Sequence, residues 1–183
     1  QVFPNGLSTT FRQLVFQPLT DGAAALARQY AFPYQADRQQ VELRGARVFR
    51  MDGRIDEAIE TGEAPVNDPS IAMYTSARTF YVQFPRLEPG DVVELKYRLE
   101  DVTPRNEYAD YFGELSYFEA DGPVANAEYI LLTPKSRRMV FETNLGRAVS
   151  HEQRDLGELR LDRFFVKELT SIDPRSEERR VGK

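Results

Sequence analysis

The sequence predicts an all-β fold, a β-sandwich of two mostly antiparallel sheets with one short helix. Segments in which apolar and polar residues alternate recur roughly every ten residues, and turn-forming residues separate them. The clearest pair surrounds residues 85–91, a segment with two prolines and Gly90. Period-two alternation gives each strand one buried face. Two apolar sets follow this rule, before and after the turn, and we expect the two strands to form a hairpin: Phe80, Val82, Phe84, and Val93, Leu95, Tyr97, Leu99.

The first forty residues contain one expected strand and the one expected helix. Residues 8–19 read as a strand with apolar groups on both faces. Residues 23–30 are rich in alanine, which favours a helix of about two turns. Pro33 is expected to stop this helix, because the residue before a proline prefers an extended backbone.

The next segment predicts a strand with a defect. In residues 40–51 the apolar phase changes across Gly45, as a β-bulge would make it. Asp52 and Gly53 fit a two-residue hairpin turn, with residues 55–59 as the returning strand. Residues 60–69 contain glycine and two prolines and are expected to form a loop.

The second half of the chain adds further expected strands, the last bent near Arg163. Residues 144–156 are polar and are expected to form a long loop. We therefore predict one β-sandwich domain over residues 1–173. Residues 174–183 are predicted to be a flexible charged tail, either an ordinary terminus or a translated adapter sequence that is not native. The further expected strands are residues 111–119, 127–132, 138–143 and 159–172.

Composition limits the chemistry. The chain has 183 residues, no cysteine and one histidine. It therefore has neither a thiol nucleophile nor a thiolate metal site. The formal net charge is −5, without a basic stripe, which argues against nucleic acid and anionic membrane surfaces as partners. No segment of the sequence approaches the roughly 20 consecutive apolar residues that a helix needs to span a bilayer. The sequence predicts no cofactor and no metal site.

A series of short blocks along the chain occurs in this order: Val41-Glu42-Leu43, Ala46-Arg47-Val48, Asp52-Gly53, Ala72-Met73-Tyr74, Ala77-Arg78, the run from Val82 through Pro89-Gly90-Asp91 to Glu94, Tyr97-Arg98, Tyr111-Phe112-Gly113-Glu114, Pro123-Val124 and Tyr129-Ile130-Leu131. Together these blocks resemble a bacterial family, domain-of-unknown-function family 3857, which precedes transglutaminase-like, papain-type cysteine hydrolase domains. The resemblance implies a β-sandwich accessory domain without catalytic residues, in a periplasmic or extracellular protein, with the hydrolase domain of the same chain as its partner.

Tyrosines are the best candidates for binding. Tyr81 lies on the face opposite to the buried residues of its strand, and Tyr108, Tyr111 and Tyr117 follow nearby in the sequence. An exposed aromatic surface stacks on a sugar ring or packs against a partner. In a two-domain protein it packs more simply against the neighbouring domain, and we favour that interpretation.

Some polar groups are further candidates for a site. Asp110 and Glu114 would share a strand face and could form a glycosidase carboxylate pair, but a solvated strand face explains them more simply. Asn67, Asp68 and Asp101 are oxygen donors that calcium would accept, although turns use the same residues.

The single histidine, His151, is expected to lie in a polar surface loop beside Glu152. As a base for Ser150 or Ser8 it would need an oxyanion signature, and the sequence has none.

The sequence thus leads to a non-catalytic accessory module for an adjacent transglutaminase-like domain. The alternatives that stay open are a standalone extracytoplasmic glycan-binding sandwich, with a possible glycan or peptide ligand, and a carboxylate-based glycosidase.

Overall fold

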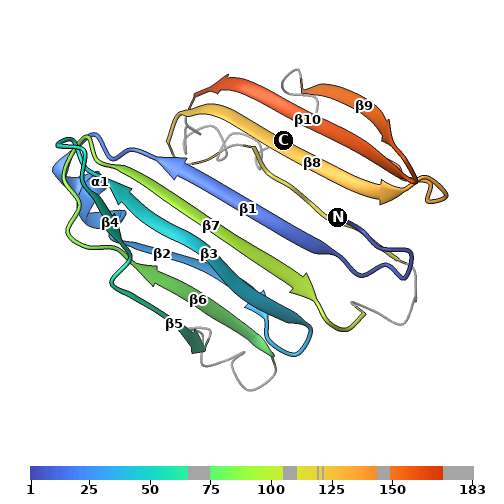
Figure 1. Ribbon diagram of the computed structural model, residues 1–183, viewed down its shortest axis with the longest axis horizontal. Helices are drawn as coiled ribbons and strands as arrows, with labels where there is room; N and C mark the ends of the chain where they lie inside the picture. The colour runs from blue at the N-terminus through green and yellow to red at the C-terminus, as the bar shows by residue number, and fades with distance from the viewer. Residues whose placement is uncertain (66–74, 105–110, 119, 121, 144–148, 171–183) are drawn as a thin grey trace, which may run out of the picture. The chain divides into compact units, whose positions relative to one another are not determined.

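A computed structural model describes residues 1–65, 75–104, 111–118, 120, 122–143 and 149–170 (Figure 1). The chain divides into a two-sheet unit, Leu7–Ala109, and a one-sheet unit, Gln1–Gly6 with Asp110–Lys183. In chain order the elements are β1 (Thr9–Phe16), α1 (Asp21–Leu26), β2 (Gln29–Gln35), β3 (Gln39–Phe49), β4 (Ile55–Glu57), β5 (Glu60–Pro65), β6 (Ala77–Gln83), β7 (Val92–Asp101), β8 (Val124–Pro134), β9 (Ser150–Leu156) and β10 (Leu159–Leu169).

The two-sheet unit is a β-sandwich. Its strands form sheets of order β1-β7-β3-β4 and β2-β6-β5, with antiparallel pairing throughout. The ring of Phe32 from one sheet stacks on Tyr97 from the other, with centroids 4.0 Å apart. Burial of these apolar faces against each other holds the unit together. The buried core comprises Ala24, Phe32, Ala46, Val48, Val82, Phe84, Leu87, Val93, Leu95 and Tyr97.

The one-sheet unit has the strand order β8-β10-β9. The N-terminal segment extends it, because the Val2 amide donates to the carbonyl of Leu132 on β8 at 2.8 Å. Val2 is buried, as are Phe164 and Val166 on β10. The prediction of an all-β fold with one short helix is confirmed. The described strands form three sheets, one more than expected, and the prediction of a single domain stays a prediction.

The strands on either side of residues 85–91 were expected to form a hairpin, and this is wrong. β6 and β7 lie in different sheets, so the connection crosses the sandwich from one sheet to the other. Val82 of β6 and Val93 and Leu95 of β7 are nevertheless fully buried. Alternation reports which face of a strand is buried, and it carries no information on which neighbour completes the hydrogen bonds.

The expected helix is shorter and earlier than predicted. The hydroxyl of Thr20 accepts from the Ala23 amide at 3.2 Å and caps α1 at its start. The chain then enters β2, where Phe32 packs in the core and Pro33 is exposed on an edge strand. Pro33 therefore interrupts no inner ladder, as prolines on edge strands do. The helix was predicted to extend to Tyr30. Tyr30 and Phe32 lie in β2 instead, because their packing in the core outweighs the helix propensity of the preceding alanines.

The bulge in β3 is confirmed, since the pairing with β7 shifts between Leu43 and Gly45. The β3–β4 hairpin is also present, but its loop has three residues rather than two. The Arg50 amide donates to Arg54 and the Gly53 amide to Arg50, with Gly53 at φ 87°. This is a type I turn followed by a left-handed residue. Residues 60–65, expected as a loop, form β5.

Three predictions in the second half are wrong. Residues 111–118 and 138–143 form no strand, and residues 150–156, expected within a loop, form β9. The sequence of β9 is rich in charged residues and therefore shows no apolar alternation. Its strand partner β10 carries the apolar residues of the pair. β8 and β10 are confirmed. None of the described helices is long and apolar enough to cross a membrane. The predicted tail lies outside the described residues.

Candidate functional site

Tyr81 lies on the outward face of the β2-β6-β5 sheet, as its strand parity predicted. The register places Ala31 on one side of it and Gly62 on the other. A side-chain carbon built on Gly62 would lie 2.5 Å from the Tyr81 hydroxyl oxygen and 2.7 Å from Cζ. The Tyr81 ring therefore lies across the neighbouring edge strand β5, in space that only glycine leaves open.

The Tyr81 hydroxyl is anchored to a side chain of β5. It donates to Oε1 of Glu60 at 3.0 Å. This hydrogen bond, together with the negative charge of Glu60, raises the pKa of Tyr81. The phenol stays protonated, and the ring is held by its end as well as by its strand.

Small or polar side chains surround the Tyr81 ring. The register places Pro33, Thr79 and Ala64 in the row on one side and Gln29, Gln83 and Glu60 in the row on the other. We call these six residues, together with Tyr81 and the two other members of its row, the Tyr81 face: Gln29, Ala31, Pro33, Glu60, Gly62, Ala64, Thr79, Tyr81 and Gln83.

The other predicted binding tyrosines do not share this face. Tyr111 and Tyr117 lie in the irregular segment 111–118 of the one-sheet unit, 55% and 79% exposed. Leu115 between them is also exposed. Tyr108 lies outside the described residues.

The candidate carboxylate pair is described only in part. Glu114 accepts a hydrogen bond from the Tyr129 hydroxyl at 3.0 Å, which ties segment 111–118 to β8. Asp110 lies outside the described residues, so a catalytic pair stays a prediction.

The one histidine is part of a strand, not of a loop. On β9, His151 Nε2 lies 2.9 Å from Oδ1 of Asp162 on β10, and Gln153 donates to the same oxygen at 2.8 Å. Its ring stacks on Phe164, with centroids 4.2 Å apart. Glu152 instead binds Arg163. Ser150, adjacent to His151 on the strand, points to the opposite face by alternation.

Sequence reasoning missed Asp162. It is fully buried, and its Oδ2 has no hydrogen-bond partner within the described part of the chain. The available signal was a carboxylate on the same strand face as Phe164 and Val166, two and four residues further on, which are apolar and buried. The hydrogen bonds of His151 and Gln153 to Asp162 connect β9 to β10.

The candidate oxygen donors for calcium have structural partners or lie outside the description. Asp101 accepts from the Ser8 amide at 3.0 Å, from the Ser8 hydroxyl at 2.6 Å and from Gln39 at 3.1 Å. Asn67 and Asp68 lie outside the described residues. Among the residues described, no group of three or more acidic, His or Cys side chains could hold a metal ion.

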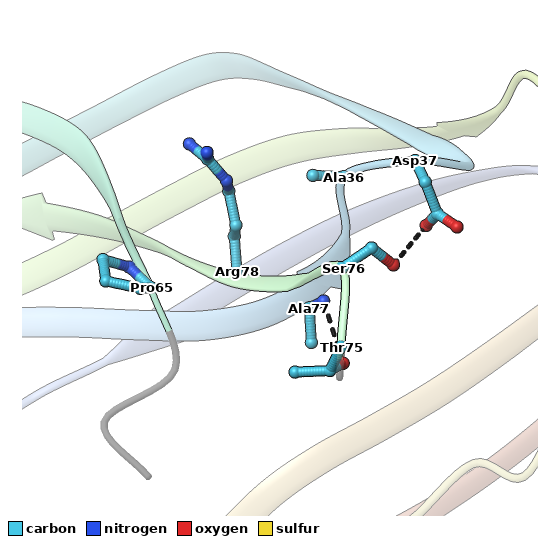
Figure 2. A pocket seen from close by; sticks show the side chains of 7 residues that line it. All are labelled: Ala36, Asp37, Pro65, Thr75, Ser76, Ala77 and Arg78. Atoms are coloured by element: carbon cyan, nitrogen blue, oxygen red, sulfur yellow. Dashed lines mark hydrogen bonds between the residues drawn. The ribbon is translucent and has the colours of Figure 1, made fainter. Parts of the chain in front are cut away.

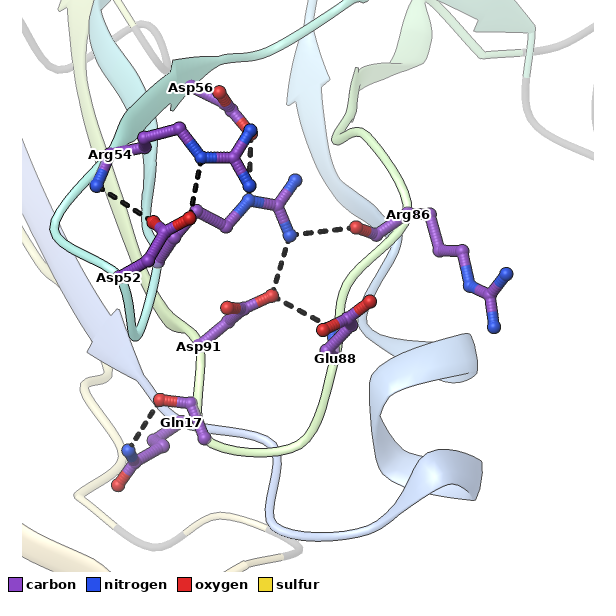
Figure 3. Close-up of polar contacts among 9 residues, drawn as sticks. Gln17, Asp52, Arg54, Asp56, Arg86, Glu88 and Asp91 are labelled. Atoms are coloured by element: carbon purple, nitrogen blue, oxygen red, sulfur yellow. Dashed lines mark hydrogen bonds and ion pairs between the residues drawn. The ribbon is translucent and has the colours of Figure 1, made fainter.

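A buried ion pair holds the sheet-to-sheet connection (Figure 3). Arg50 donates to Asp56 at 2.7 Å, to Asp91 at 2.6 Å and to the Arg86 carbonyl at 2.8 Å. Burial lowers the pKa of Arg50, but the bonds to Asp56 and Asp91 outweigh it and raise the pKa. Asp91 also accepts from the Glu88 amide at 2.8 Å. The block Pro89-Gly90-Asp91, which carried the resemblance, therefore builds a turn.

A hollow of about 390 Å³ opens at one end of the two-sheet unit (Figure 2). The Ser76 hydroxyl in its wall donates to Asp37 at 2.5 Å and lies 3.0 Å from Gln35. Among the described residues of its lining there is no histidine and no second carboxylate. Its lining residues are Ala36, Asp37, Pro65, Thr75, Ser76, Ala77 and Arg78.

Comparison with known proteins gives one family and one fold relative. The sequence profile of a domain of unknown function with a solved structure, DUF3857, matches residues 4–167. A crystal structure from Parabacteroides distasonis ATCC 8503, described as "a putative protease", is similar with a TM-score of 0.76 at 14% identity. The match covers 94% of this chain and 34% of that one. No curated protein matches the sequence.

Proposed function

The chain belongs to the DUF3857 domain family, and from this premise we propose that it is a non-catalytic accessory module. It positions, stabilises or supplies substrate to an adjacent transglutaminase-like hydrolase domain of the same protein. The observation that carries the proposal is that the similar fold covers only 34% of a longer bacterial chain, one described as "a putative protease". The module would work outside the cytoplasm, in the periplasm or at the cell exterior.

The composition of the chain supports this proposal. A papain-type hydrolase needs a cysteine nucleophile beside a histidine base, and this chain has no cysteine. Its single histidine bonds to Asp162 within a sheet. The polar clusters of the two units, around Arg50 and Asp162, connect strands to one another. These residues suit an accessory role beside a catalytic domain better than catalysis by the module itself.

Segment 111–118 supplies the surface for docking. Tyr111, Leu115 and Tyr117 expose large apolar groups within eight residues of irregular chain. Interfaces concentrate their binding energy in a few such aromatic anchors. We infer that the neighbouring hydrolase domain covers these three side chains.

Deletion of residues 1–170 from the parent protein tests the role. We expect the hydrolase domain to unfold at a lower temperature or to lose activity, because it would lose a covalently attached partner that stabilises its folded state. Calorimetry and turnover of the intact and shortened proteins measure this. Equal stability, substrate affinity and rate in both would reject the accessory role.

A double variant tests the docking surface in the same parent protein. Leu115→Ser with Tyr117→Ser should separate the two domains and lower the unfolding temperature of the hydrolase domain. Val140→Ser is the matched control, since Val140 is 84% exposed in the same unit. Limited proteolysis of the linker reports domain separation. Identical behaviour of the double variant and the control would mean that another surface makes the contact.

A further inference from the structure

We propose that the Tyr81 face binds a neutral polysaccharide, with one pyranose ring stacked on Tyr81. This inference goes beyond the accessory role and does not depend on it. It rests on the pose of one aromatic ring, on the charge of the side chains around it, and on their size.

The pose of Tyr81 suits stacking. The ring lies over Gly62, and its hydroxyl is held by Glu60 on the same edge strand. Part of the ring is therefore covered by β5, and the half-buried side chain leaves the rest of it accessible on the outward face. An aromatic face carries partial negative charge, which attracts the axial C–H groups on the flat side of a pyranose ring. A ring held in place beforehand loses little conformational entropy on binding.

The charge of the Tyr81 face matches a neutral, hydroxyl-rich ligand. Its nine residues include one carboxylate, Glu60, and no lysine or arginine. Gln29 and Gln83 add amide groups that both donate and accept hydrogen bonds. Sugar hydroxyls need this mixture. A polyanion such as nucleic acid needs cationic side chains to neutralise its phosphates, and the face has none.

The size of the surrounding side chains argues against a protein occupant. The nearest neighbours of Tyr81, Ala31, Gly62 and Ala64, offer little apolar area, whereas protein interfaces need several large buried anchors. Phe11 and Val15 on β1 and Ile55 on β4 are exposed apolar groups on other elements, and Ile59 borders the Tyr81 face beside Glu60. The small side chains beside the Tyr81 ring leave room for an extended sugar chain.

Titration of the 183-residue chain with cellohexaose, xylohexaose and chitohexaose, followed by calorimetry, tests the proposal. Polygalacturonate is the anionic comparison. We expect millimolar or tighter binding of at least one neutral oligosaccharide and none of the polyanion. Tyr81→Ala should weaken that binding by about tenfold or more. Tyr81→Phe keeps the ring and should stay within about threefold of the parent.

Matched variants keep the result interpretable. Tyr117→Ala removes an exposed tyrosine from the other unit and should bind like the parent chain. Far-ultraviolet circular dichroism and thermal unfolding check that Tyr81→Ala is folded; if it is not, Gly62→Val, which displaces the ring from β5, must show the same loss. Absence of binding to every neutral probe overturns the proposal, and so does unchanged binding in Tyr81→Ala. If Tyr81→Ala instead abolishes association with the hydrolase domain, the face docks protein and the sugar proposal is wrong.

Discussion

Asp91 is the residue on which the sheet-to-sheet connection depends most. Its side chain is 4% exposed, and it accepts from Arg50, which is 13% exposed. Removing one member of a buried pair leaves the other charge without compensation, which costs about 3–5 kcal/mol. We expect Asp91→Ala to lower the free energy of unfolding by about 3 kcal/mol, near the lower end because Arg50 keeps Asp56. Urea unfolding measures the change.

Asp52 provides the control for this prediction. It pairs with Arg54 at 2.7 Å in the same hairpin, but both side chains are more than half exposed. Exposed pairs are screened by water and contribute little. Asp52→Ala should leave the urea midpoint unchanged, and equal losses in the two variants would refute the assigned role of Asp91.

Gly62 determines the pose of Tyr81. A methyl group at this position would overlap the phenol ring, so Gly62→Ala should displace the ring and break its hydrogen bond to Glu60. Since that bond is the main cause of the raised pKa of Tyr81, the pKa should fall toward the ordinary value of tyrosine. An NMR titration of Tyr81 measures the shift, and Gly22→Ala, which meets nothing, is the control. An unchanged pKa would contradict the described ring position.

At the scale of elements, the turn between β6 and β7 is the most demanding connection. The Asp91 amide donates to the Glu88 carbonyl at 3.1 Å, and Gly90 has φ 95°. Pro89 and a left-handed Gly90 make this a type II turn. Gly90→Ala places a side chain in a backbone region that costs about 1–3 kcal/mol. Chemical denaturation should show a loss of this size.

Substitution of Gly22, in helix α1, is expected to stabilise the protein, in contrast to substitution of Gly90. It lies inside α1, where a side-chain carbon would meet nothing. Alanine is favoured over glycine within a helix by about 1 kcal/mol. Gly22→Ala should therefore stabilise the protein where Gly90→Ala destabilises it. The same sign for both would mean that one of the two backbone assignments is incorrect.

At the scale of the whole molecule, the core of the two-sheet unit makes stability depend on pH in alkali. Burial, and then the hydroxyl of Tyr30, raise the pKa of Tyr97 from 10.0 to about 12. A folded-state pKa above the unfolded value means that the unfolded chain ionises first. The contribution of Tyr97 is complete below pH 10 and is lost as the pH rises toward about 12.

Tyr97→Phe tests this dependence. The variant keeps the ring that stacks on Phe32 and removes the ionisable hydroxyl. Unfolding curves measured between neutral and alkaline pH should fall less steeply for the variant than for the parent chain. Parallel curves would show that Tyr97 ionises normally in the folded protein.

The candidate site was predictable in part. Strand parity placed Tyr81 on the outward face, and the structure agrees. The same parity could not reveal that Gly62, from a segment expected to be a loop, lies under its ring. His151 was expected beside Glu152, its neighbour in sequence, yet its partner is Asp162 on the next strand. Such contacts depend on register between strands, which a single sequence leaves open.

Alternation, turn residues and composition were enough to establish an all-β chain, the buried faces of β6 and β7, the bulge at Gly45 and the lack of a thiol nucleophile. These properties belong to each strand or residue alone, so local pattern specifies them. The assignment of β6 and β7 to different sheets, the strand character of β2, β5 and β9, and the bond between His151 and Asp162 required the tertiary structure. Each depends on which distant segment supplies the hydrogen bonds and the buried surface, and that choice is made by packing among strands.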